Sequence, residues 1–433
     1  MAFYLNGIKL PHKKYTAKTP AVDIPPVAQV TIPMSMHIGA PAKPVVKKGD
    51  QVFVGTLIAE AAPGLSSPIH SSVSGTVNSI SEILLANGST CESVIIDSDG
   101  QMTLDSNIAK PQVNTKEELL DAITKSGIVG LGGAGFPTFV KFKTDKPIEE
   151  LVINGAECEP YITSDTVTML TRAEEMKHAI QTLVNYFDIK KVVIGIEKNK
   201  PEAIDNMKKM ASEIENTSVV VLPSIYPQGG EKVLVYHTTR KVIPEGGLPI
   251  DVGCVVCNCT TIAEIGKYLQ TGIPLVSKVI TVDGPAVRDR HNLIVPIGTL
   301  IKDVFEFCGI KRELGKVIYG GPMMGISVPN TDMPIMKNTN AVLAFSKKRT
   351  ILPETTACIR CGACVNNCPL SISPIEILKS YKANDYLGMK KAGALLCMEC
   401  GCCSYVCPAR IPNVQNNKLA KLAIRNEPKK EVK

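Results

Sequence analysis

The sequence predicts a multidomain protein that combines α/β and α+β folds with an N-terminal β module. Three observations lead to this fold class. The first 110 residues contain short β runs, residues 111–250 alternate helices with strands, and the last part carries two regularly spaced cysteine runs. The chain has 433 residues, enough for about three ordinary domains, and its content of 44% hydrophobic and 21% charged residues is that of a globular protein.

Residues 1–110 are predicted to form the β module. The β-prone runs are separated by turn residues and lie at residues 42–46, 51–59, 75–80 and 94–96. The module resembles the barrel-sandwich hybrid of biotinyl- and lipoyl-type domains. The attachment lysine of those domains is missing, because no lysine lies between Lys48 and Lys110, so we expect a structural module. We expect His37 and His70 to form local hydrogen bonds or a docking contact rather than to act as ligands.

Residues 111–250 are predicted to form an α/β domain. Segments with helical periodicity alternate with apolar strands, which is the pattern of a mostly parallel sheet covered by helices. The predicted helices lie at residues 116–125, 173–187 and 201–214, and the predicted strands lie at residues 151–153, 191–196 and 218–222.

Residues 251–340 are predicted to form a small α+β module, with strands at 278–282 and 293–295 and a helix at 261–268. Cys254, Cys257 and Cys259 fall among valines at its start. This composition favours a buried strand in which free cysteine behaves as a small hydrophobe; a metal site with the spacing C-x2-C-x-C is the alternative.

Eight cysteines near the C-terminus repeat one spacing, C-x2-C-x2-C-x3-C-P. This run is the bacterial-type frame for a [4Fe–4S] cluster, and in two-cluster ferredoxins the fourth cysteine binds the other cluster. Zinc usually takes two separated pairs of ligands, and disulfides need an oxidising compartment. Residues 345–433 are therefore predicted to form a two-cluster ferredoxin-like domain. One cluster is assigned to Cys358, Cys361, Cys364 and Cys407, and the other to Cys397, Cys400, Cys403 and Cys368.

Cys402 lies between two predicted ligands, and we expect it to be a bystander. The segment from Arg410 onward carries a charge of +5 within a total of +7. Such a basic, partly helical tail can contact anionic lipid or an acidic partner, or it can simply be solvated. Nucleic-acid binding is not expected, because no basic stripe is interleaved with aromatic residues and the chain has no tryptophan.

A glycine-rich segment satisfies the pattern G-x-G-x-x-G through Gly130, Gly132, Gly133 and Gly135. Glycines allow backbone N–H groups to approach a phosphate. A standard dinucleotide fold would also need a clear preceding strand, and residues 126–129 are too short to provide it. The segment therefore predicts a phosphate-bearing cofactor bound outside a standard dinucleotide fold.

Two further loops follow predicted strands of the α/β domain. The first contains Asn154, Glu157 and Glu159, and the second contains Gly230 and Glu231. Ligands of α/β sheets bind beyond the carboxyl ends of the strands. We therefore expect both loops to border a cofactor cleft, the alternative for the first loop being a turn with solvated acids.

These segments carry a family resemblance. Residues 132–141, 154–160 and 258–261 are similar to the flavin- and NADH-binding motifs of the flavoprotein subunit of respiratory complex I. Together with residues 37–42, 67–70, 226–232, 246–249 and 320–325 and the cysteine runs, the chain from about residue 5 to 415 resembles the C subunit of Rnf complexes. Residues 251–340 then resemble the soluble-ligand-binding β-grasp (SLBB) domain. The cobalamin reductase of propanediol-utilisation microcompartments shares this plan and is the alternative.

The resemblance implies two [4Fe–4S] clusters, FMN and NAD(H) as cofactors. It implies an FMN phosphate near Gly132, Gly133 and Gly135, flavin contacts from Lys141 and Asn258, Glu157 and Glu159 beside the flavin and nicotinamide, and Gly230 and Glu231 on the same cleft. One departure is visible: the complex I motif has an acid at the position of Ala156. A non-catalytic carrier of clusters with a vestigial flavin site is a further alternative.

The resemblance also implies a place in the cell. The chain would be a peripheral subunit at the cytoplasmic face of the membrane, within an ion-translocating ferredoxin:NAD+ oxidoreductase. Its partners would be the membrane and iron–sulfur subunits of the Rnf complex, with ferredoxin reached through them. No apolar run reaches the ~18 residues that span a bilayer, and the N-terminus lacks a secretory pattern.

Overall fold

The computed structural model describes residues 5–427. Its first module contains two small sheets whose inward side chains form one core. The run expected at residues 51–59 is divided into two strands at Gly55, whose φ of +94° breaks the extended conformation. One sheet has the order β2 (Gln29–Pro33), β8 (Thr90–Ser98), β7 (Gly75–Leu84) and β4 (Gln51–Val52), and the other has β3 (Lys43–Pro44), β5 (Leu57–Glu60) and β6 (Ile69–His70).

The two histidines of this module are buried. Ser67 N donates to His37 Nε2 at 3.1 Å, as expected of a local hydrogen-bonding residue. Burial lowers the pKa of His37 to about 4 and the pKa of His70 to about 3, so both rings are neutral at physiological pH. The next segment along the chain leads to α1 (Lys116–Lys125). Thr115 and Glu118 form a capping box at the N-terminus of this helix.

A four-stranded parallel sheet forms the core of the α/β domain, with the order β11-β10-β9-β12. Its strands are β9 (Glu150–Gly155), β10 (Lys191–Glu197), β11 (Thr217–Leu222) and β12 (Cys254–Asn258). One face packs against α4 (Ala173–Phe187), α5 (Pro201–Ala211) and α7 (Cys259–Thr271), and the other packs against α6 (Glu231–Thr239). The predicted parallel sheet covered by helices is thus present.

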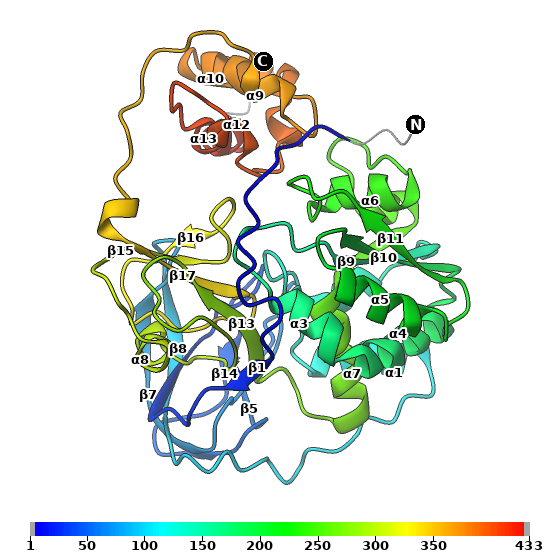
Figure 1. The fold of residues 1–433 in the computed structure, drawn as a ribbon. Helices are drawn as coiled ribbons and strands as arrows, with labels where there is room; N and C mark the ends of the chain where they lie inside the picture. Colours follow the sequence, from blue (N-terminus) through cyan, green and yellow to red (C-terminus); the bar gives the residue numbers. More distant parts are fainter. Residues whose placement is uncertain (1–4, 428–433) are drawn as a thin grey trace, which may run out of the picture.

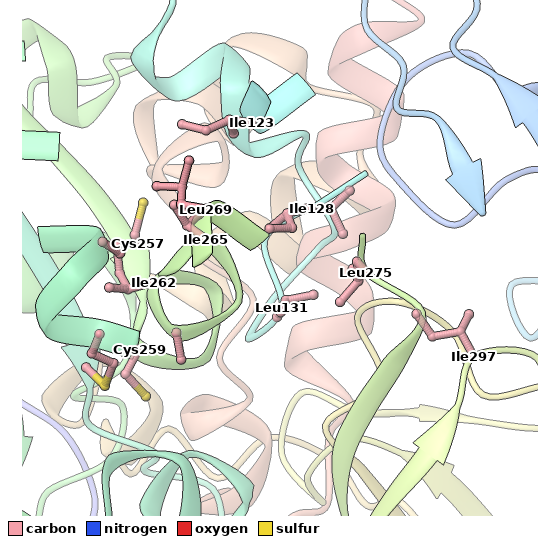
Figure 2. Close-up of a cluster of buried hydrophobic side chains, with 14 of the residues drawn as sticks. Ile123, Ile128, Leu131, Cys257, Cys259, Ile262, Ile265, Leu269, Leu275 and Ile297 are labelled. Atoms are coloured by element: carbon pink, nitrogen blue, oxygen red, sulfur yellow. The ribbon is translucent and has the colours of Figure 1, made fainter. Parts of the chain in front are cut away.

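The first of these faces is a continuous apolar core. Figure 2 shows part of it, with Ile262 and Leu269 of α7 in one cluster with Leu131, which belongs to the glycine-rich segment. Cys257 and Cys259 are buried in the same cluster. The prediction of a buried strand is confirmed for Cys254 and Cys257, which lie in β12. Cys259 is also buried, but it is the first residue of α7 and so lies outside the strand.

The sheet includes more of the chain than residues 111–250. Strand β12 pairs with β9 in the register Cys254↔Glu150 to Asn258↔Asn154, and α7 packs on the same core. Both elements had been assigned by sequence to the following α+β module. The reason for the difference is that β12 joins its sheet through pairing with a strand about a hundred residues earlier, and nothing local in the sequence specifies that partner.

The α+β module is a six-stranded mixed sheet covered by α8 (Ile301–Cys308), which buries Ile301, Val304 and Phe305 against it. Its first strand comes from the N-terminal segment, which runs past α3 (Ser164–Thr171) before joining the sheet (Figure 1, dark blue). The order is β1 (Ala21–Asp23), β14 (His291–Pro296), β13 (Ser277–Asp283), β17 (Ala341–Ser346), β15 (Leu314–Tyr319) and β16 (Ile326–Ser327).

The C-terminal domain is helical and lies at one end of the molecule, joined by an extended segment (Figure 1, orange to red). Its core forms where α10 and α13 pack together. The helices are α9 (Ala363–Asn366), α10 (Pro374–Lys382), α11 (Tyr386–Lys391), α12 (Cys402–Tyr405) and α13 (Asn413–Arg425). The basic tail is helical through α13, while Lys429, Lys430 and Lys433 lie outside the described residues. Within residues 5–427, no helix is both long and apolar enough to cross a bilayer.

Candidate functional site

The candidate site lies at the carboxyl edge of the parallel sheet. From β9 the chain adds β10 and β11 on one side and then β12 on the other side. The point where the strand order reverses is therefore between β9 and β12, and ligands of open α/β sheets bind in the crevice at such a point. Asn154 and Asn258 occupy paired positions at the ends of these two strands.

The glycine-rich loop covers the end of β12. A Cβ atom on Gly132 would lie 2.4 Å from Asn258 Nδ2, so only glycine allows this close approach. Leu131 N donates to Thr261 Oγ1 at 3.0 Å, which ties the loop to α7. The crest is exposed at Gly132 and Gly133, and among the described residues no atom lies within 4 Å of a Cβ built on Gly133. This open crest of backbone fits the phosphate of a bound cofactor.

The flanks of the loop are held from both sides. Gly130 N donates to Phe136 O at 2.8 Å. Gly135 has a φ of +73°, and Ile38 N of the β module donates to its carbonyl at 3.1 Å. From the α+β module, Asn338 Nδ2 donates to Gly133 O at 3.1 Å. Three parts of the chain therefore fix the crest.

The remaining expected cofactor residues continue along the same edge. Lys141, from the short helix α2 (Thr138–Phe142), donates through Nζ to Val256 O of β12 at 2.7 Å. The same Nζ lies 4.0 Å from Glu231 Oε1 at the start of α6. Asn154 Nδ2 donates to Gly229 O at 3.0 Å, next to Gly230. The structure thus brings Gly132, Gly133, Lys141, Asn154, Gly230, Glu231 and Asn258 together on one edge.

Glu157 is buried and its carboxylate is used within the protein. It accepts hydrogen bonds from Asp165 N at 2.7 Å and Thr166 Oγ1 at 2.5 Å, at the first turn of α3. Lys14 Nζ lies 3.7 Å from its Oε2. Burial raises the pKa of Glu157, and Lys14 opposes that shift. The carboxylate therefore anchors the loop after β9 to α3.

Glu159 has a comparable role on the other side of the loop. Its carboxylate accepts hydrogen bonds from Met323 N at 3.0 Å and Met324 N at 2.8 Å, in the loop between β15 and β16. Burial raises the pKa of Glu159 to about 7, and the two backbone donors oppose this shift. The sequence predicts that both acids lie beside flavin and nicotinamide. In the structure, both carboxylates are hydrogen-bonded to other groups of the protein.

Sequence reasoning missed Lys14 and Lys200, which hold the same loop from outside. Lys14 Nζ donates to Glu157 O at 2.7 Å, Glu159 O at 2.8 Å and Ile162 O at 2.5 Å. Burial lowers the pKa of Lys14 to about 8, and Glu157 opposes this shift. Lys200 Nζ donates to Ala156 O at 2.6 Å. Neither lysine belongs to a motif, and Lys14 lies more than a hundred positions before the loop.

The C-terminal cysteines gather in two groups. Cys364 is partly buried, which raises the pKa of its thiol, and Cys407 and Cys358 are near enough to raise it further. The second group lines a cavity together with Met398, Asn417 and the extra cysteine Cys402. This group consists of Cys368, Cys397, Cys400 and Cys403. The fourth cysteine of each run thus lies with the other run.

The thiols of the second group line a cavity and do not converge on the position of a single ion. Within residues 5–427 no three His, Cys, Asp or Glu side chains are arranged around a single metal ion. In a [4Fe–4S] cluster each cysteine binds a different iron, so its ligands are spread around a cube. The cavity is lined by the four predicted ligands of one cluster and by Cys402, and this set of thiols suits such a group. Cys402 is buried and its Sγ lies 4.0 Å from Tyr226 O, at the contact with the α/β domain.

The second cysteine run packs directly on the carboxyl edge. Tyr226 Oη donates to Cys400 O at 2.7 Å. A Cβ atom on Gly230 would lie 1.9 Å from Met398 Cε, and one on Gly401 would lie 3.0 Å from Met323 O. Cys358 and Cys361 of the first run are exposed. The Cys397 group is therefore on the cleft side, and the Cys358 group faces outward.

Family models match three parts of the chain, and each fits the module found there. The RnfC barrel sandwich hybrid domain matches residues 3–101, the Nuo51 FMN-binding domain matches residues 123–267, and the 4Fe–4S dicluster domain matches residues 354–411. The FMN-binding model extends beyond residue 250, in agreement with the place of β12 and α7 in the sheet.

Curated relatives match most of the chain. It is 42% identical over 84% of its length to the C subunit of the proton-translocating ferredoxin:NAD(+) oxidoreductase complex of Clostridium ljungdahlii, covering 80% of that protein. It is 40% identical over 88% of its length to the C subunit of the Na(+)-translocating ferredoxin:NAD(+) oxidoreductase complex of Acetobacterium woodii, covering 88% of that protein.

A solved structure adds a likeness in fold. The crystal structure of an NAD+-reducing [NiFe]-hydrogenase in the H2-reduced state has a TM-score of 0.51 at 17% identity, over 72% of this chain and 62% of that chain. Because these C subunits are 40–42% identical to the chain over 84–88% of its length, this chain belongs to the family of C subunits of ion-translocating ferredoxin:NAD(+) oxidoreductase (Rnf) complexes.

Proposed function

We propose that this chain passes electrons between NAD(H), FMN and two [4Fe–4S] clusters as the C subunit of an Rnf complex. The observation that carries this proposal is the contact between the two candidate sites. The run from Cys397 to Cys403 packs through Met398 and Cys400 on Gly230 and Tyr226, at the edge that also holds the glycine crest. A flavin exchanges two electrons with a nicotinamide and single electrons with a cluster, so it belongs between them.

The residues of the edge suggest separate tasks. The backbone at Gly132 and Gly133 would receive the FMN phosphate, because its crest is open and unobstructed by side chains. Lys141 and Asn258 would contact the flavin from the end of β12, through the N–H groups that remain after Lys141 Nζ donates to Val256 O and Asn258 Nδ2 donates to Asp165 Oδ2 at 2.7 Å. Gly230 and Glu231 would border the nicotinamide side, where Met398 of the cluster run is also in contact.

We propose positioning roles for Glu157, which is buried, and for Glu159, which is half-buried, because protein donors occupy their carboxylates. Glu157 fixes the loop to α3, and Glu159 fixes it to Met323 and Met324. Together with Lys14 they would hold Asn154 and its neighbours at the switch point of the sheet. The loop would then be rigid before any nucleotide binds.

The outward side of the Cys358 group would face the rest of the complex. Cys358 and Cys361 are exposed, which suits electron exchange with another iron–sulfur subunit. We propose that the chain is a peripheral subunit at the cytoplasmic face of the membrane, held by membrane subunits, and that it exchanges electrons with ferredoxin through them. Purification of the complex from native membranes tests this arrangement: the chain is expected to copurify with membrane subunits, and recovery as a free protein with no partners would contradict it.

The variant Gly133→Val tests the cofactor site. A Cβ atom on Gly133 has no neighbour within 4 Å among residues 5–427, so a valine there points its side chain into the open space above the crest. The variant is expected to fold, to keep its iron and to lose at least about tenfold in FMN affinity. The measurement is anaerobic absorption spectroscopy with iron and flavin assays before and after addition of NADH. Wild-type protein should show bleaching of bound flavin by NADH. Absence of bleaching in the wild type, or full flavin content in the variant, would contradict the proposed site.

A further inference from the structure

A buried asparagine of α13, the helix that follows the second cysteine run, donates a hydrogen bond to a predicted cluster ligand. Asn417 in α13 is completely buried, and its Nδ2 donates to Cys397 Sγ at 3.4 Å. It also lines the cavity that Cys368, Cys400 and Cys403 share with Cys397. A thiolate only accepts hydrogen bonds, so the amide nitrogen, and not its oxygen, must face the sulfur.

The oxygen of the same amide has no partner in the part of the chain that the structure describes, so the stability of the fold does not explain why an asparagine occupies this position. Asn417 Oδ1 is buried and has no hydrogen-bond partner among the described residues. A buried acceptor without a partner costs free energy, and an apolar side chain at this position would not carry that cost. Leucine has nearly the shape of asparagine and would fill this position in an apolar helix face. The N–H···S contact is what leucine could not provide.

The internal repeat of the domain offers a direct comparison. Leu378 in α10 and Asn417 in α13 each lie ten residues after the fourth cysteine of their run. Leu378 packs in an apolar cluster with Cys407 of the outward group. The backbone donors are the same in both runs: Arg360 N donates to Cys358 Sγ and Glu399 N donates to Cys397 Sγ, both at 3.4 Å. The two cluster sites therefore differ at this equivalent position: Asn417 donates a hydrogen bond to a cysteine sulfur, and Leu378 has no donor in its side chain.

We propose that Asn417 raises the reduction potential of the cluster held by Cys368, Cys397, Cys400 and Cys403. One-electron reduction adds negative charge to the cluster and its thiolates with no bond broken, and an N–H donor to a thiolate stabilises the more negative form. Asn417 would thus be a positioning and tuning residue on the cleft side, where the electron is exchanged with the flavin. This inference rests on the proposed function, because it assumes that the cysteines hold a cluster.

The test is the variant Asn417→Leu in the full chain, with Asn416→Leu as the matched control on the adjacent, partly exposed face of the same helix. The two clusters are followed by EPR during anaerobic titration with dithionite and redox mediators. For Asn417→Leu the ratio of reduced to oxidised cleft-side cluster at a fixed potential is expected to fall about tenfold, a shift of about 59 mV to lower potential for one electron. The other cluster and the Asn416→Leu variant should titrate like the wild type.

Iron content separates the outcomes. Eight irons per chain are expected for two clusters in wild type and in both variants. If Asn417→Leu keeps its iron and its cleft-side cluster titrates at the wild-type potential, the inference fails while the proposed function stands. If the wild type itself binds no cluster, the proposed function fails. Loss of iron from both Asn417→Leu and the smaller variant Asn417→Ala would overturn the inference in favour of a structural role.

Discussion

The carboxylate of Glu159 holds two parts of the structure together instead of facing solvent. It is enclosed by the loop between β15 and β16, where a Cβ atom on Gly321 would lie 2.3 Å from Glu159 Cδ. Its hydrogen bonds join the parallel sheet to the mixed sheet of the α+β module. The motif in the sequence identified this acid, but a motif does not specify which way its carboxylate turns.

The raised pKa of Glu159 leads to a pH-dependent stability. Its pKa is about 7 in the folded protein against 4.5 for an unperturbed glutamate, so between these values the folded state binds the proton and the unfolded state does not. Its contribution to stability therefore decreases as pH rises from about 4.5 to 7. Glu159→Gln stays neutral at all these values. The Tm of the wild type should decrease from pH 5.5 to pH 8, and the decrease should be smaller in Glu159→Gln by roughly 2 °C. Equal decreases in the two proteins would contradict the assignment.

At the scale of elements, the N-terminal strap (residues 5–16) joins parts of the molecule that are distant in sequence. Ile8 forms a β-bridge with Tyr226, Ile8 and Leu10 pack in one cluster with Cys400 and Cys402, and Lys14 reaches the loop after β9. Figure 1 shows this dark blue segment passing from the C-terminal domain down to α3 and β1. The strap thereby connects the cluster run to the cofactor edge.

Lys14→Met is expected to release the loop after β9. The substitution keeps the length of the side chain but removes the ammonium that donates to three carbonyl oxygens. Glu157 O keeps Lys200 Nζ at 3.4 Å, whereas Glu159 O and Ile162 O lose their side-chain donor, and each buried unpaired group costs about 1–3 kcal/mol. NADH oxidation with an artificial acceptor should fall by at least about tenfold, since about 1.4 kcal/mol in loop position is a factor of ten. Lys18→Met, at an exposed ion pair with Glu202, is the control. Unchanged NADH turnover in Lys14→Met would exclude a role for the strap in the site.

Elements could be predicted from sequence where the signal is local. Thr115 and Glu118 form the capping box that starts α1, and apolar periodicity defines α4, so both helices have the predicted bounds. The glycine crest and the two cysteine runs were likewise visible, because each depends on a few adjacent residues. Lys14, Asn417 and the partner of β12 were not predictable in this way, because their contacts join residues whose separation no pattern specifies.

At the scale of the whole molecule, the contact between the C-terminal domain and the carboxyl edge decides whether electrons can pass. Tyr226→Phe removes the hydrogen bond to Cys400 O and should cost about 1 kcal/mol at this contact. We expect slower reduction of the cleft-side cluster by NADH, by roughly threefold to tenfold, with flavin reduction itself unchanged. Rapid-mixing spectroscopy separates these two phases.

Tyr319→Phe provides the matched control, because it removes a hydrogen bond of 2.6 Å to Pro334 O within the α+β module. It should leave the rates of flavin and cluster reduction at wild-type values. Equal effects of the two substitutions on cluster reduction would show that the contact at Tyr226 has no special part in electron transfer.

The sequence by itself determined the chemical inventory of this protein: the two sets of four thiols, the glycine crest and the order of its modules. These follow from short-range spacing, which backbone geometry converts directly into local structure. Only the tertiary structure decided that the Cys397 run lies on the cofactor edge, that the two acids point into the protein, and that an asparagine reaches one sulfur. Such facts depend on which surfaces pack together, and packing is settled by the burial of the whole chain rather than by any one segment.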